Sequence, residues 1–185
     1  MRPDQASQPE LKVRRLDPGP LNADWAWTPD GWQAASGANG DALSPAARLF
    51  HDDETARIAV TPLADGVALQ PEAFQGGFVS VALDLPEGGV RGLSPHHVVS
   101  ADIGLERPLS SQAFLRLNLR LGPDTIMRMV GLPSEPGWAS IDLDRAFHDA
   151  RTVDHAWLDL ICERPGLSRL SFAVKAVRRH PRPAM

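Results

Sequence analysis

The chain has 185 residues, of which 43% are hydrophobic and 23% charged, as is usual for one globular domain. Its 17 prolines argue against a helix-rich fold, because proline removes an amide donor and clashes with the preceding helical turn. The formal net charge of −4 argues against nucleic acid as a partner, since nucleic-acid-binding domains usually present a strongly basic surface.

The chain contains one cysteine and no long apolar segment. Cys162 has no second cysteine with which to form an internal disulfide, so the sequence does not require an oxidising compartment. No apolar segment of signal-peptide length opens the chain, and no run of 18 apolar residues occurs in it. We therefore expect no membrane span and a cytoplasmic location, with incorporation into a phage-like particle as the alternative.

The first part of the chain is expected to differ from the rest. Residues 1–22 contain four prolines and few large apolar groups, which predicts a flexible N-terminal arm. Residues 23–180 are expected to form one domain, followed by a short tail at 181–185. The domain opens with Trp25, Trp27 and Trp32, which either cover a sheet edge within the molecule or contact another chain.

From residue 48 onward, apolar and polar residues alternate with the period of a β-strand. The clearest case is 113–121, where leucines face one way and Arg116, Asn118 and Arg120 the other. One solvent-exposed face and one buried face are typical of an antiparallel sheet that is covered on one side by a second sheet. Further strands are predicted at 48–51, 56–61, 78–85, 99–106, 125–130, 138–143, 153–162 and 169–177, and one or two helical turns at 144–152.

This pattern predicts the fold class. Eight or nine strands without alternating helices indicate an all-β, antiparallel two-sheet sandwich that is jelly-roll-like, with at most one or two short helices. The strand order cannot be deduced from the pattern.

No residue pattern indicates a catalytic site. The sequence lacks the Gly-x-Ser-x-Gly turn of many hydrolases, and we interpret Ser94, before Pro95-His96-His97, as part of a polar turn. Pairs of acids on one strand face, such as Asp142 and Asp144, are common on exposed strands and do not by themselves make a glycosidase. We therefore expect a protein that is not an enzyme, with a small hydrolase as the alternative.

The sequence also predicts no cofactor and no metal. Its histidines lack the spacing of a zinc-binding helix. Asp52 and Asp53 are candidates for a structural calcium in a loop, but their turn lacks the spaced oxygen ligands of an EF-hand. A solvated turn is the simpler interpretation.

Binding chemistry fits the sequence better. Stacking on aromatic rings, with polar groups for the hydroxyls, is one way in which β-sandwich domains hold sugars. The candidate binding residues are Trp25, Trp27, Trp32, Arg116, Asn118 and Arg120. Trp157 lies on the outer face of its strand in the alternation, although core packing is the commoner outcome for so large a side chain. We therefore predict a binding or assembly module that recognises a glycan or a partner protein.

Four segments carry a family resemblance: SVALDLPEGGVRGLSPHHVV, ERPLSSQAFLRLNLRLGPDT, IDLDRAF and AWLDLICERPGLSRLSFAVKAVRRHPRPAM. They resemble an uncharacterised β-sandwich family of rhodobacter-like alphaproteobacteria. Because they are turns and core strands, the resemblance implies fold and kinship but no site residue.

A looser association links these bacteria to gene transfer agents, phage-like particles whose head spikes are thought to engage capsular polysaccharide. It implies an alternative role as a head spike or capsid-bound adaptor, acting through a homo-oligomer or through contact with a capsid.

Overall fold

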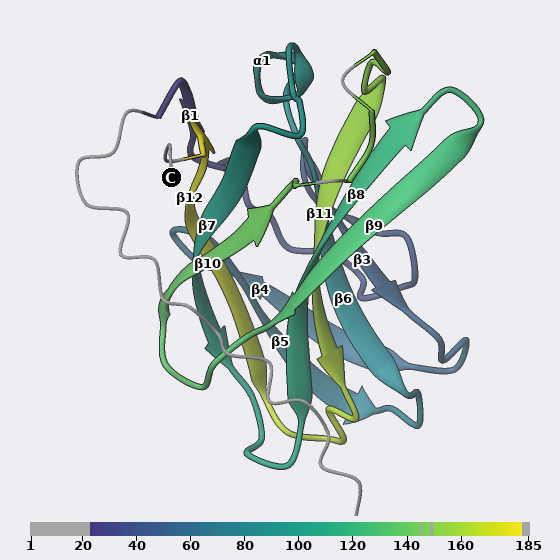
Figure 1. The fold of residues 1–185 in the computed structure, drawn as a ribbon. Helices are drawn as coiled ribbons and strands as arrows, with labels where there is room; N and C mark the ends of the chain where they lie inside the picture. The colour runs from purple at the N-terminus through teal and green to yellow at the C-terminus, as the bar shows by residue number, and fades with distance from the viewer. Residues whose placement is uncertain (1–22, 145, 149, 183–185) are drawn as a thin grey trace, which may run out of the picture.

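A computed structural model describes residues 23–144, 146–148 and 150–182, which form antiparallel strands and one short helix (Figure 1). In chain order the elements are β1 (Trp25–Trp27), β2 (Ala42–Ser44), β3 (Ala47–His51), β4 (Arg57–Pro62), β5 (Gly66–Ala73), β6 (Phe78–Asp84), α1 (Glu87–Val90), β7 (His97–Glu106), β8 (Gln112–Leu121), β9 (Asp124–Gly131), β10 (Gly137–Asp142), β11 (His155–Glu163) and β12 (Leu170–Pro181).

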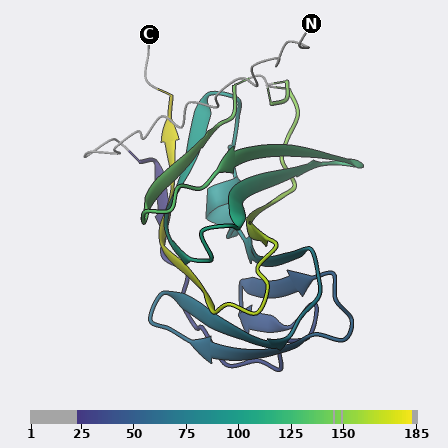
Figure 2. The ribbon, with the colours of Figure 1, turned by 90° about the horizontal axis from the view of Figure 1, so that it is seen from below.

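The strands form two six-stranded sheets packed face to face. Sheet A has the order β10-β7-β12-β5-β4, with β1 beside β12, and sheet B has the order β2-β3-β6-β11-β8-β9. From β3 onward the chain changes sheet between β3 and β4, β5 and β6, β6 and β7, β7 and β8, β9 and β10, β10 and β11, and β11 and β12. The predicted all-β, two-sheet, jelly-roll-like sandwich is thereby confirmed. Figure 2 shows β1 next to the C-terminal part of β12.

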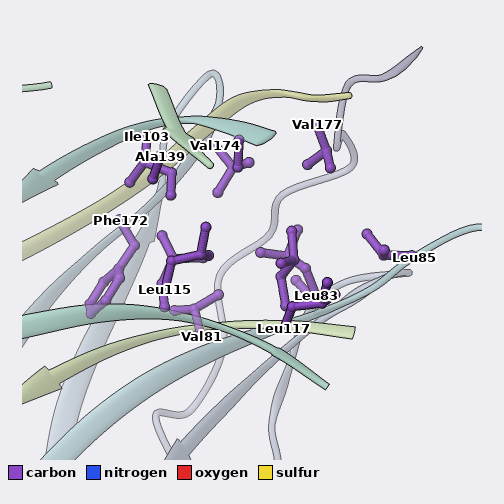
Figure 3. Close-up of a cluster of buried hydrophobic side chains, with 14 of the residues drawn as sticks. Val81, Leu83, Leu85, Ile103, Leu115, Leu117, Ala139, Phe172, Val174 and Val177 are labelled. Atoms are coloured by element: carbon purple, nitrogen blue, oxygen red, sulfur yellow. The ribbon is translucent and has the colours of Figure 1, made fainter. Parts of the chain in front are cut away.

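The core lies between the two sheets and is filled by the inward side chains of both. On β8, Leu115, Leu117 and Leu119 are each 0% exposed. Phe172 and Val174 on β12 reach toward them from sheet A (Figure 3). Because a shift of one residue would turn every leucine of β8 outward, this burial fixes the register of the strand.

Three strands and the helix differ from the prediction. β1 and β2 are too short for a visible alternation, and β5 contains Pro71, which would weaken an interior strand. The proline is accommodated because β12 pairs only with Gly66–Leu69 of β5, so Pro71 faces β4 alone. The helix is α1, whereas the described residues of 144–152 form turns and bends.

Some predicted features lie outside the described residues, namely the arm at 1–22 and the end of the tail at 183–185. Within the described part of the chain, no helix has the length and apolar character needed to cross a membrane.

The packing predicts that a buried leucine contributes much more to the free energy of unfolding than an exposed one. Leu117→Ala should lower the free energy of unfolding by about 2–5 kcal/mol, because it opens a cavity in the dry interior. Leu109→Ala is the matched control, since Leu109 is 94% exposed in a loop, and it should cost less than about 0.5 kcal/mol. Urea denaturation of both variants gives the comparison; equal losses would show that 117 is not a core position.

Candidate functional site

The outer face of sheet B combines aromatic and charged side chains from four neighbouring strands, β3, β6, β11 and β8. Trp157 of β11 stands at its centre, paired in register with Asn118 of β8 on one side and Asp84 of β6 on the other. Two residues before Trp157 on β11, and on the same face, His155 lies opposite Arg120. The strand alternation that fills the core therefore places these residues on one outward surface.

Trp157 and His155 form a stacked pair on this face. Their ring centroids are 5.4 Å apart and their planes are inclined by 27°. Nε2 of His155 lies 3.0 Å from Oδ1 of Asp84, which holds the imidazole from its far side. The contact and the hydrogen bond together limit rotation of both rings, so the aromatic surface is ordered before any ligand arrives.

A shallow hollow of about 320 Å³ surrounds this pair, and we call it the Trp157 hollow. It is lined by the rings of Phe50, His155 and Trp157 and by the charged groups of Arg48, Asp84 and Arg120. Phe50 is 37% exposed and adds a third ring to the hollow. Aromatic rings together with a few polar groups are the composition expected of a ligand site.

The side chains of the two arginines in the hollow make few hydrogen bonds and no ion pairs with the described residues. Arg48 makes one hydrogen bond, 3.4 Å long, from Nη1 to the carbonyl of Gly40. Arg120 is exposed and has no hydrogen-bond or ion-pair partner among the described residues. Both guanidinium groups therefore keep free donors.

Arg116 and Asn118 have a different role from Arg120. The carboxylate of Asp159, 4% exposed, accepts hydrogen bonds from Nε and Nη2 of Arg116 at 2.9 and 2.7 Å and from Nδ2 of Asn118 at 2.9 Å. Three donors compensate the buried charge of Asp159. Asn118 is only 2% exposed, so it is not available to a ligand. It helps to hold Asp159 in place beneath the surface.

The predicted tryptophan cluster lies elsewhere, with Trp25 and Trp27 on β1 of sheet A and Trp32 in the loop that follows. Trp25 and Trp27 are partly buried against the core, with ring centroids 6.4 Å apart. A Cβ added to Gly89 would come within 2.7 Å of the Trp25 ring, so α1 needs glycine at this contact. Trp32 also packs against the core. The structure therefore shows an intramolecular cover, and partner binding by these three residues stays a prediction.

Asp24 fastens this cover to the sandwich. Its Oδ1 lies 2.9 Å from Nε of Arg179, whose Nη1 donates to the carbonyls of Gly89 and Arg91 at 3.1 and 2.7 Å. Its Oδ2 lies 3.2 Å from Nε2 of His97. These contacts join the start of the domain, α1 and β12.

The same histidine contacts Ser94, which gives a chain of Ser94, His97 and Asp24. The amide and Oγ of Ser94 both approach Nδ1 of His97, at 3.1 and 3.0 Å, and the amide of His97 donates to the Ser94 carbonyl. Ser94 thus lies in a tight turn whose polar atoms are satisfied locally, as a polar turn before β7 predicts. The carboxylate of Asp24 is engaged with Arg179, and Ser94 does not line the Trp157 hollow.

The calcium candidates organise a turn. Asp52 accepts hydrogen bonds from the amide of Gly77 at 2.8 and 3.0 Å, and Asp53 accepts them from the amides of Gln75 and Thr55 at 2.7 and 2.9 Å. Among the described residues, no three His, Cys, Asp or Glu side chains are grouped so as to hold a metal ion.

A family model, Family of unknown function (DUF6478), matches residues 4–185. The chain belongs to this family. The search of curated proteins returns no match for this DUF6478 protein.

Several solved structures are similar to the DUF6478 protein at low identity. A xylan-binding module CBM15 has 14% identity and a TM-score of 0.46, covering 82% of this chain and 97% of its own. A family 11 carbohydrate-binding module from Clostridium thermocellum, in complex with a β-1,3-1,4-mixed-linked tetrasaccharide, has 9% identity and a TM-score of 0.48, covering 86% and 98%. A cyclase from Fischerella sp. TAU has 12% identity and a TM-score of 0.46, covering 85% and 88%. These likenesses concern the fold alone.

Sequence reasoning missed four residues of the Trp157 hollow in the DUF6478 protein, namely Arg48, Phe50, Asp84 and His155. They lie on β3, β6 and β11, and only the strand order and register bring them beside Arg120. The signal that was available is the outward position of Trp157.

The Asp24 contacts predict an acid-sensitive step. Burial raises the pKa of Asp24, but the hydrogen bond and charge of Arg179, followed by those of His97, bring it below the ordinary value of 3.8. Because the folded state binds this proton less tightly, the stabilisation is complete above pH 3.8 and is lost as the pH falls through the lowered pKa.

Asp24→Asn should therefore destabilise the DUF6478 protein at neutral pH and differ least from the wild type in strong acid. Urea denaturation across an acidic pH series measures this. Asp30→Asn is the control, because Asp30 is exposed and should leave the profile unchanged. A constant difference between Asp24→Asn and wild type at every pH would contradict the assignment.

Proposed function

We propose that the protein binds a glycan in the Trp157 hollow on the outer face of sheet B. The observation that carries this proposal is the stacked Trp157–His155 pair at the floor of a hollow whose rim supplies hydrogen-bonding groups. A sugar ring presents an apolar C–H face and a border of hydroxyl groups, and the hollow offers a counterpart to each.

The rim matches both hydrogen-bonding roles of a hydroxyl group. Arg48 and Arg120 can donate to hydroxyl oxygens, and the carboxylate of Asp84, with a side chain 54% exposed, can accept from hydroxyl hydrogens. The surface is carried by central strands over a close-packed core, so little conformational entropy is lost when a ligand binds.

The same residues favour binding without cleavage. Hydrolysis of a glycosidic bond ordinarily uses two carboxyl groups on either side of the bond. Asp84 is the one carboxylate among the described residues that line the hollow. We therefore propose a binding module and not a glycosidase.

Replacement of the stacking residue tests the proposal. Trp157→Ala should weaken retention on an immobilised polysaccharide array roughly tenfold or more, as expected for a central aromatic contact. Trp138→Ala is the matched control, because Trp138 lies on sheet A with Arg178 4.9 Å from its ring centroid, and it should retain binding. Near-ultraviolet circular dichroism confirms that both variants are folded. Equal binding by the two variants, or retention on no polysaccharide, would refute the proposal.

A second candidate is self-association through β9, the edge strand of sheet B. Met127 and Met129 of β9 are 55% and 56% exposed, and one row of its backbone groups faces away from β8. An uncapped edge with apolar side chains is prone to pair with another strand. Pairing with a second copy is also the property that a particle component, such as a head spike or capsid-bound adaptor, requires.

Native mass across a concentration series tests the second candidate. A dimer is expected for the wild type, and Met127→Lys with Met129→Lys should convert it to a monomer because charges at the edge oppose pairing. Leu109→Lys, at a loop residue 94% exposed, should leave the dimer intact. A monomeric wild type at all concentrations rules this candidate out without affecting glycan binding.

A further inference from the structure

The Trp157 hollow holds two arginines that no carboxylate neutralises, although the chain as a whole has a net charge of −4. We infer that its ligand is an acidic polysaccharide, with carboxylate or sulfate groups on either side of the sugar that stacks on Trp157. This inference rests on the proposed glycan binding and specifies the chemical class of the glycan.

Five arginines elsewhere in the described residues form ion pairs with carboxylates: Arg91 with Glu87, Arg116 with Asp159, Arg151 with Asp124, Arg179 with Asp24 and Arg182 with Asp142. Others, such as Arg57 and Arg169, form no ion pair with the described residues either, so what distinguishes Arg48 and Arg120 is their place beside the Trp157 ring. Arg120 has no such partner, and Arg48 has only the carbonyl of Gly40 at 3.4 Å. The hollow therefore keeps two guanidinium groups available.

The acid of the hollow offsets only part of this charge. Asp84 lies 3.0 Å from Nε2 of His155 and forms no ion pair with either arginine. Two guanidinium groups against one carboxylate leave the hollow with a positive excess. A guanidinium presents a planar fork of N–H donors that matches the two oxygens of a carboxylate and also suits a sulfate.

The positions of the arginines indicate a polymer. Arg48 is on β3 and Arg120 on β8, with β6 and β11 between them, so Trp157 lies between the two arginines across the sheet. Three strand spacings separate their backbones by about 14 Å across the sheet, and the register offsets them by four residues, about 13 Å, along the strands, so the line that joins them runs diagonally past Trp157. A chain of sugars that passes over Trp157 can meet one arginine on each side, whereas a single sugar on the ring contacts at most the nearer group.

The experiment compares matched polysaccharides by affinity electrophoresis and calorimetry. The probes are polygalacturonate, the same polymer with its carboxyl groups reduced to alcohols, dextran sulfate with neutral dextran, and galacturonic acid monomer. We expect the wild type to bind an acidic polymer at least tenfold more tightly than its neutral counterpart and than the monomer, with affinity that falls as salt rises. Preference for polygalacturonate or for dextran sulfate identifies the acidic group.

Two variants and a control assign the effect to the hollow. Arg48→Gln and Arg120→Gln should each weaken binding of the preferred acidic polymer about tenfold and weaken any binding of neutral polymers much less, because the glutamine amide can still donate to a hydroxyl group. Arg57→Gln is the matched control, because Arg57 is exposed on β4 of sheet A, and it should bind as the wild type does.

The outcomes separate this inference from the proposal on which it rests. Equal binding of neutral and acidic polymers that is lost in Trp157→Ala overturns the acidic class and leaves glycan binding intact. Binding of no polysaccharide overturns both. Acidic binding that Trp157→Ala leaves unchanged, or that single-stranded DNA reproduces in full, would show a general attraction for polyanions and also overturns the inference.

Discussion

The burial of one side of each central strand is the constraint on which the rest of this structure depends. On β8 the dry side is Leu115, Leu117 and Leu119, each 0% exposed, and a slip of one residue would place all three in water. The register thus fixed also determines which residues meet outside the sandwich. Trp157 lies beside Asp84, and His155 beside Arg120, because the leucines of β8 cannot move.

The outer face is supported by a buried charge that is fully compensated. Asp159 faces outward from β11 yet is 4% exposed, and its carboxylate joins Arg116 and Asn118 across the β8–β11 pair. A charge in this position is stable only while its donors stay in place, so the network holds the two strands to one geometry. The ring of Trp157, one position along β11 on the same face, therefore stands on a rigid support.

The fold can be predicted from the sequence more fully than the candidate site can. Alternation along 113–121 predicts the sandwich and the outward set that includes Arg120, because a strand period is a local property. Arg48, Asp84 and His155 could not be recognised, since each is an ordinary surface residue until strand order brings β3, β6, β11 and β8 together. The sequence could not show that Asn118 is buried or that Trp25 packs inward, because both depend on contacts with distant segments.

The central position of β12 has a consequence for biosynthesis. β12 pairs with β1, β5 and β7, so sheet A lacks its central strand until residues 170–181 have been synthesised. Until then β5 and β7 expose unsatisfied edges and the apolar side chains meant for the interior. Completion of sheet A therefore depends on long-range pairing, which is slow to form and leaves apolar strands open to aggregation until β12 is in place.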